Sequence, residues 1–119
     1  MDKKIMIVDD AMFMRKVIKR ALSQGGYDNF VEAGDGVEAV EKYKEYQPDL
    51  MLLDITMPER SGLEVLNEVL AFNRNAKVIM CSAVGQEQVI AEAIRCGASD
   101  FIIKPFKDEE ILKIVTAYL

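Results

Sequence analysis

The chain has 119 residues, of which half are apolar, and its 20 acidic and 15 basic side chains give a net charge of -5. This length is enough for one domain with its own core and too short for two. The acidic balance argues against a nucleic-acid backbone as the main partner, and no apolar run suits a signal peptide or a membrane span. We therefore expect a single cytoplasmic domain over residues 1–119, with no membrane insertion and no nucleic acid.

Five short apolar runs recur along the chain and are typical of buried strands. In chain order they cover residues 5–8, 30–33, 50–53, 78–81 and 101–103. Each run is followed by apolar residues at helical spacing. These are Met14, Val17, Ile18, Ala21 and Leu22, then Val37, Val40 and Tyr43, then Leu63, Leu66 and Leu70, then Ile90, Ala93 and Ile94, and finally Ile111, Ile114, Val115 and Tyr118.

The ends of several predicted helices are marked by residues that do not continue a helix. Gly25 and Gly26 end the first helix, Pro48 follows the second, and Gly97 ends the fourth. Strict alternation of strand and helix predicts an α/β fold, a doubly wound five-stranded parallel sheet with five helices covering both of its faces.

Two groups of residues have an ordinary structural interpretation. Arg15, Lys16, Lys19 and Arg20 alternate with apolar residues, so we interpret them as the solvated face of the first helix. Cys81 and Cys96 are far apart in a chain that has no histidine, so we expect two buried small side chains and no metal clip between them.

Polar side chains follow four of the predicted strands. Asp9 and Asp10 come after the first strand, Asp54 after the third, Ser82 after the fourth and Lys104 after the fifth. Ligands of an open parallel sheet bind outside the carboxyl ends of its strands. We therefore expect three carboxylates, a hydroxyl and an ammonium group to meet at one edge of the sheet.

Crowded carboxylates repel one another unless a cation joins them, and oxygen donors suit Mg²⁺. A magnesium ion beside a spare carboxylate and a lysine is typical of phosphoryl-transfer sites. Alternatively, Asp9, Asp10 and Asp54 cap the helices that follow them, because aspartate is a favoured N-cap residue. Capping does not explain Lys104 at the end of another strand.

These residues resemble the receiver domain of two-component response regulators, and the resemblance covers essentially the whole chain. The matching segments are Val8-Asp9-Asp10, then Asp54-Ile55-Thr56-Met57-Pro58 with Gly62, then Ser82-Ala83, and Lys104-Pro105-Phe106. The resemblance implies the flavodoxin-like strand order 2-1-3-4-5.

The resemblance also implies roles for the site residues. Asp54 would accept a phosphoryl group from a sensor histidine kinase. Asp10, Asp54 and the backbone carbonyl of Thr56 would bind Mg²⁺ directly, and Asp9 would act through a water. Lys104 would pair with the phosphoryl oxygens. The protein would then be a phosphorylated switch, not an enzyme, although it assists its own phosphorylation and dephosphorylation.

Two further residues belong to the implied switch. Ser82 would donate a hydrogen bond to the phosphoryl group and draw its loop inward. Phe101 matches the position where chemotaxis members usually carry a tyrosine that rotates as the loop moves, so a partner contact through that hydroxyl is in doubt here. We expect the Lys104-Pro105 peptide bond to be cis, as is common in the family.

Residues 8–15 and 82–86 resemble chemotaxis receivers of the CheY type more than those of transcription factors. The implied partners are a CheA-like histidine kinase and, as output target, the flagellar motor switch protein. Contact would be made through the fourth helix, fifth strand and fifth helix of a monomer.

Three alternatives remain open. The chain is also compatible with a receiver cut from a longer transcriptional or sporulation regulator. Residues 34–39 match the dinucleotide fingerprint G-x-G-x-x-A, which suggests a nucleotide- or flavin-binding module, but they follow the second strand and carry Asp35 inside the phosphate loop. An aspartyl-phosphate hydrolase would need an acid where the chain has Thr56.

Overall fold

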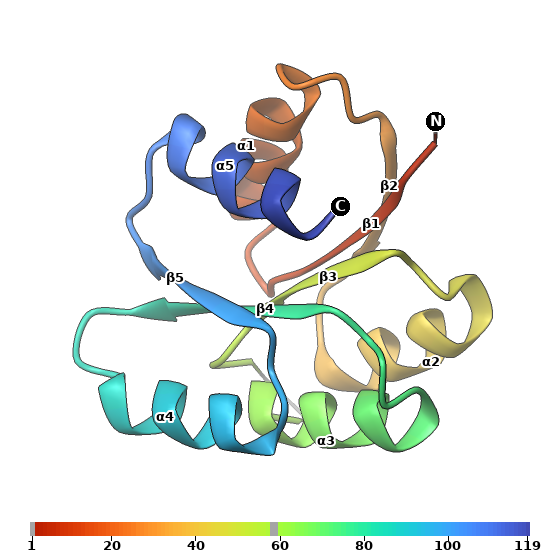
Figure 1. The fold of residues 1–119 in the computed structure, drawn as a ribbon, viewed down its shortest axis with the longest axis vertical. Coiled ribbons are helices and arrows are strands. Elements are labelled where there is room, and N and C mark those ends of the chain that lie inside the picture. Colours follow the sequence, from red (N-terminus) through yellow and green to blue (C-terminus); the bar gives the residue numbers. More distant parts are fainter. Residues whose placement is uncertain (1, 58–59) are drawn as a thin grey trace.

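A computed structural model describes residues 2–57 and 60–119, in which five strands alternate with five helices (Figure 1). The elements are β1 Lys4–Val8, α1 Met12–Ser23, β2 Asn29–Ala33, α2 Gly36–Tyr46, β3 Leu50–Asp54, α3 Gly62–Phe72, β4 Val78–Ala83, α4 Glu87–Cys96, β5 Asp100–Lys104 and α5 Asp108–Tyr118. Each predicted apolar run is a strand, one or two residues longer than the run itself. None of these helices is long and apolar enough to cross a bilayer.

The strands form one parallel sheet in the order β2-β1-β3-β4-β5, which confirms the expected order. At the carboxyl edge, Val8 lies opposite Leu53, and Asp54 lies opposite Cys81 on the next strand. The carboxyl ends of β1, β3, β4 and β5 therefore lie at one edge of the sheet, and β4 and β5 extend beyond Asp54 to the pair Ala83 and Lys104.

Helices cover both faces of the sheet, α1 and α5 on one face and α2, α3 and α4 on the other (Figure 1). Alternate strand residues point to opposite faces. The core under α1 and α5 contains Ile5, Ile7, Leu50, Leu52 and Ile79 with Ile18, Leu22, Ile111 and Val115. The core under α2 to α4 contains Met6, Val8, Met51, Leu53 and Met80 with Val40, Val65, Leu66 and Ile90.

Local sequence signals set several helix ends. The Asp35 side chain accepts a hydrogen bond of 2.8 Å from the Glu38 amide and caps α2, and Ser61 forms a capping box with Glu64 at the start of α3. As predicted, Gly97 ends α4, where its φ of 118° lies in a left-handed region that suits glycine.

Two predicted members of the buried helix faces lie on the surface. Val37 is 40% exposed because the first turn of α2 packs Gly36 against the backbone of Arg60 and buries Ala39 and Val40. Ile94 is 42% exposed because α4 buries only a narrow stripe on the core. Helical spacing therefore indicates which side of α2 and α4 faces the core, but not how many residues on that side are buried.

The two cysteines are not equivalent. Cys81 is buried in β4, as predicted, whereas Cys96 at the end of α4 is only partly buried. Both are free thiols.

Candidate functional site

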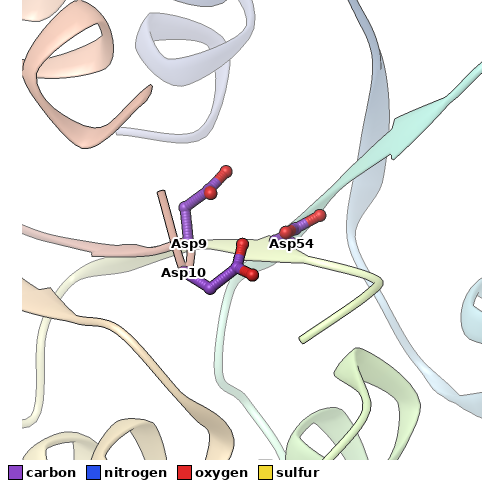
Figure 2. A group of neighbouring side chains, drawn as sticks. All are labelled: Asp9, Asp10 and Asp54. Carbon is purple, nitrogen blue, oxygen red and sulfur yellow. The ribbon is translucent and has the colours of Figure 1, made fainter. Parts of the chain in front are cut away.

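Three carboxylates meet at the carboxyl edge of the sheet. Asp9 and Asp10 follow β1, Asp54 ends β3, and one carboxylate oxygen of each lies within 4.8 Å of the others. Asp9 and Asp54 are buried, whereas Asp10 is exposed. Figure 2 shows the three side chains gathered where the two neighbouring strands end. The predicted convergence of these acids is confirmed.

Lys104 reaches this cluster from the end of β5. Its Nζ atom lies 2.9 Å from Asp9 Oδ2 and 3.3 Å from Asp54 Oδ1. The Lys104-Pro105 peptide bond is cis, as expected. The lysine joins the two buried carboxylates and, among the described residues, is the one cation within 4.0 Å of Asp54.

Burial and neighbouring charges shift the pKa values at the site. Burial raises the pKa of Asp54, and the negative charge of Asp9 adds to this, while Lys104 and a hydrogen bond from the Thr56 backbone oppose it; the net shift is upward. Burial alone would lower the pKa of Lys104, but its hydrogen bond to Asp9 and attraction to Asp54 raise it overall. The ionised Asp54 carboxylate is therefore stabilised less than an exposed one, and a further cation would favour it.

The side chain of Ser82 is fully buried in β4, one residue after the partner of Asp54 in the sheet. Its Oγ atom has no hydrogen-bond partner among the described residues. A buried hydroxyl without a partner costs about 1–3 kcal/mol, so a new acceptor at this edge would be stabilised by it. Such an acceptor fits the role predicted for Ser82.

Phe101 and Thr56 complete the set of predicted residues. Phe101 lies on the edge strand β5 and is 40% exposed as a whole residue. Thr56 lies two residues after Asp54 and is exposed, and its backbone helps to lower the pKa of the Asp54 carboxyl. Pro58, part of the predicted motif, lies outside the described residues.

Sequence reasoning missed the role of Arg15. The side chain is only 15% exposed, so the prediction of a solvated basic face was wrong for this residue. Its guanidinium donates hydrogen bonds to the backbone carbonyl of Asp9 and, at 3.0 Å, to Glu32 on β2. Lys19 also pairs with Glu32, and this hydrogen bond is the main reason why the pKa of Glu32 is lowered. Arg15 thus ties the acidic turn after β1 to the neighbouring strand.

Gln86 is a second residue that sequence reasoning did not connect with the site. Its Oε1 accepts a hydrogen bond of 2.7 Å from the Ala83 amide, and its Nε2 donates one of 3.0 Å to the hydroxyl of Thr56. No motif would have indicated this contact, because Gln86 and Thr56 are 30 residues apart.

The dinucleotide fingerprint does not form a phosphate cradle. The Asp35 carboxylate accepts from the Glu38 amide, and the Glu38 carboxylate accepts from the Gly34 amide at 2.7 Å. A nucleotide phosphate would need such backbone donors. Because the loop's own side chains already use them, the local geometry favours capping.

The arrangement suits a hard divalent cation and a phosphoryl group. Its donors are carboxylate oxygens, which Mg²⁺ prefers, and both Lys104 and the Ser82 hydroxyl can face added negative charge. No histidine or thiolate belongs to the cluster, so a zinc-type donor set is absent from it.

Comparison with known proteins agrees with this geometry. The family model described as "Response regulator receiver domain" matches residues 5–116. The chemotaxis protein CheY of Thermotoga maritima is 48% identical over 113 residues, which cover 95% of this chain and 94% of that protein. CheY of Bacillus subtilis is 47% identical over 119 residues, which cover 100% of this chain and 99% of that protein.

Longer proteins also contain a similar segment. The regulatory protein AtoC of Escherichia coli is 35% identical over 94% of this chain, which covers 24% of AtoC. Among solved structures, the CheX-CheY-BeF₃-Mg complex from Borrelia burgdorferi contains a chain with a TM-score of 0.91 and 36% identity, covering 98% of this chain and 90% of that one. The protein therefore belongs to the response regulator receiver domain family and is of the CheY type.

Proposed function

We propose that residues 1–119 act as one receiver domain in which Asp54 accepts a phosphoryl group from a phosphohistidine of a sensor kinase. The convergence of Asp9, Asp10, Asp54 and Lys104 from the ends of three strands carries this proposal. Capping alone would leave each acid near its own helix and would not bring a lysine between two of them.

The cluster has the donor set for one Mg²⁺ ion. Asp10, Asp54 and the backbone carbonyl of Thr56 would hold it, with Asp9 acting through a water; the mutual distance of up to 4.8 Å between carboxylate oxygens supports this assignment. When bound, the metal supplies charge neutralisation for the transferred phosphoryl group.

The residues of the chain have separate roles in the transfer. A carboxylate oxygen of Asp54 forms a bond to phosphorus as the phosphorus–nitrogen bond of the donor breaks and the imidazole leaves. Lys104 is already within 3.3 Å of Asp54, and it pairs with the new phosphoryl oxygens. The buried Ser82 hydroxyl donates a hydrogen bond to one of them. The domain is a switch that assists its own phosphorylation and dephosphorylation, and its product is its own modified state.

The similarity to CheY proteins supports a proposal for the partners. We assign a CheA-like histidine kinase as donor and the flagellar motor switch protein as output target, reached in the cytoplasm by a monomer through α4, β5 and α5. Phe101 lies on this surface with its ring partly exposed, so it takes part through its apolar ring. The similarity to a segment of AtoC supports the alternative that the same module serves a longer regulator.

The test is phosphorylation by acetyl phosphate, with and without Mg²⁺, followed by intact mass. We expect a single Mg²⁺-dependent, base-labile phosphoryl adduct on the wild type and none on Asp54→Asn. Asp28→Asn is a matched control, since Asp28 is exposed before β2, at the opposite edge of the sheet. An adduct that persists on Asp54→Asn, or none on the wild type under any metal condition, would contradict the proposal.

A further inference from the structure

The Gln86 side chain connects two loops beside the acceptor. One hydrogen bond joins it to the Ala83 amide at the end of β4, and the other to the Thr56 hydroxyl in the loop after β3. We refer to these two hydrogen bonds as the Gln86 link. It spans the carboxyl ends of neighbouring strands, beside the predicted phosphoryl site.

Gln86 does not cap the helix that it precedes. It is the N-cap residue of α4, but its side chain makes no capping hydrogen bond. Glutamine is not among the favoured N-cap residues, and the side chain turns back over the loop instead. Gly85 before it has a φ of 96°, which closes the turn between Ala83 and α4.

The Gln86 link is continuous with the acceptor on one side and the switch on the other. Thr56 lies two residues after Asp54, and its backbone helps to lower the pKa of that carboxyl. Ala83 directly follows Ser82, whose buried hydroxyl has no partner among the described residues. A movement of Ser82 toward a group on Asp54 therefore displaces the Ala83 amide, which donates a hydrogen bond to Gln86.

We propose that the Gln86 link is a positioning device that holds the β4–α4 loop in its unphosphorylated arrangement and so slows phosphorylation of Asp54. The proposal rests on the proposed function, because it requires Ser82 to move toward the phosphoryl group. The β4–α4 loop has two arrangements, one without and one with a phosphoryl group on Asp54. A contact that is made in only one arrangement increases the population of that arrangement.

The size of the effect follows from the two hydrogen bonds of the link, which break when the loop moves. Both hydrogen bonds are exposed to solvent, so each contributes only modestly to the equilibrium between the two loop arrangements. Removing the link by Gln86→Ala therefore speeds acyl phosphate formation by about threefold to tenfold. Gln88→Ala is the matched control, because Gln88 is exposed on the same helix and makes no side-chain hydrogen bond among the described residues.

The first measurement is the initial rate of adduct formation from acetyl phosphate at saturating Mg²⁺, read by intact mass. Wild type, Gln86→Ala and Gln88→Ala are compared, each also in a Ser82→Ala background. Because the link acts through Ser82, the Gln86 substitution accelerates only proteins that keep the serine. Equal rates for wild type and Gln86→Ala overturn the proposal. So does equal acceleration with and without Ser82, since Gln86 would then only shield the acceptor.

The second measurement tests the contact itself without any phosphodonor. Amide hydrogen exchange at Ala83 becomes faster in Gln86→Ala than in wild type or Gln88→Ala, because the amide loses its acceptor. Unchanged exchange overturns the proposal even if rates differ. If the wild type takes no phosphoryl group at all, the proposed function itself has failed. A phosphorylated wild type with an unaltered Gln86→Ala rate rejects only the role of the link.

Discussion

Asp54, the proposed phosphoryl acceptor, is a buried acid whose ionisation is opposed by its surroundings. Burial and the nearby Asp9 raise the pKa of Asp54, and Lys104 offsets only part of this effect. The buried, ionised Asp54 carboxylate lowers the free energy of unfolding, and residues that lower stability in this way are typical of functional sites. The rest of the strand that carries Asp54 is apolar.

This shift predicts a pH-dependent gain in stability for Asp54→Asn. The pKa of Asp54 is higher in the folded chain than in the unfolded chain, where it is near 3.8. Such a carboxyl contributes stability that is fully present below the unfolded pKa and is lost as the pH rises through the folded pKa. Asparagine has no such loss. We expect Asp54→Asn to have a higher free energy of unfolding than the wild type at pH 7, and the difference to shrink toward pH 4.

Urea unfolding in metal-free buffer at both pH values measures this difference. Asp28→Asn is the control, because an exposed carboxyl should change little at either pH. A wild type that is more stable than Asp54→Asn at pH 7 would contradict the assigned direction.

The two thiols should differ sharply in reactivity. Burial raises the pKa of Cys81 to about 12, so almost no thiolate exists near neutral pH, and Cys96 is partly exposed at the end of α4. We predict that iodoacetamide labels the native protein once at pH 8, at Cys96, and twice in urea. Peptide mapping identifies the label, and native Cys96→Ala should take none. Labelling of Cys81 in the folded Cys96→Ala variant would refute the prediction.

At the scale of elements, the loop between β2 and α2 is held by its own side chains. Asp35 caps α2 through the Glu38 amide, and Glu38 accepts from the Gly34 amide. The first turn of α2 is packed tightly, since a Cβ atom on Gly36 would lie 2.5 Å from Arg60 Cβ. Structural requirements therefore account for the glycine-rich segment that resembles a dinucleotide fingerprint.

We predict that Asp35→Ala lowers the free energy of unfolding by about 1 kcal/mol, because the helix loses its N-cap. Asp28→Ala, at an exposed carboxyl without a capping role, should cost much less. Urea unfolding measures both variants, and acetyl phosphate should still phosphorylate Asp35→Ala at the wild-type rate. A loss in Asp35→Ala no greater than that of the control would show that the cap does not stabilise α2.

At the scale of the whole molecule, the proposed metal site joins elements that are distant in the chain. Its carboxylates come from the turn after β1 and the end of β3, and Lys104 comes from β5. Such a site forms only when the sheet is assembled. Metal binding should therefore be linked to global unfolding.

We predict that Mg²⁺ stabilises the wild type by about 2.7 kcal/mol at a concentration of 100 times its dissociation constant, and that EDTA removes the gain. Asp10→Asn should lose most of this stabilisation while remaining folded, because Asp10 is exposed and belongs to neither core cluster. The measurement is thermal unfolding against Mg²⁺ concentration, with Asp28→Asn as control. An equal Mg²⁺ response in Asp10→Asn would exclude it from the site.

Much of the fold was predictable because its signals are local. Branched and apolar runs form the strands, and Gly97 ends α4 where a left-handed residue is needed. The buried residues of the helices were harder to predict, as the exposed Val37 and Ile94 demonstrate. Burial of a helix residue depends on how wide a face the helix packs against its neighbours. Spacing along a helix indicates a face but not its width.

The sequence by itself determined the α/β class, the position of Asp9, Asp10, Asp54, Ser82 and Lys104 at strand ends, and hence the edge where the site lies. Only the tertiary structure decided which of these groups touch. It placed Lys104 between Asp9 and Asp54, tied Arg15 to the Asp9 carbonyl and joined Gln86 to Thr56. The physical reason is that strand ends follow from local sequence patterns. Contacts between segments far apart in the chain depend instead on the distances between the packed elements and on the side-chain rotamers, and the spacing of residues in the sequence specifies neither.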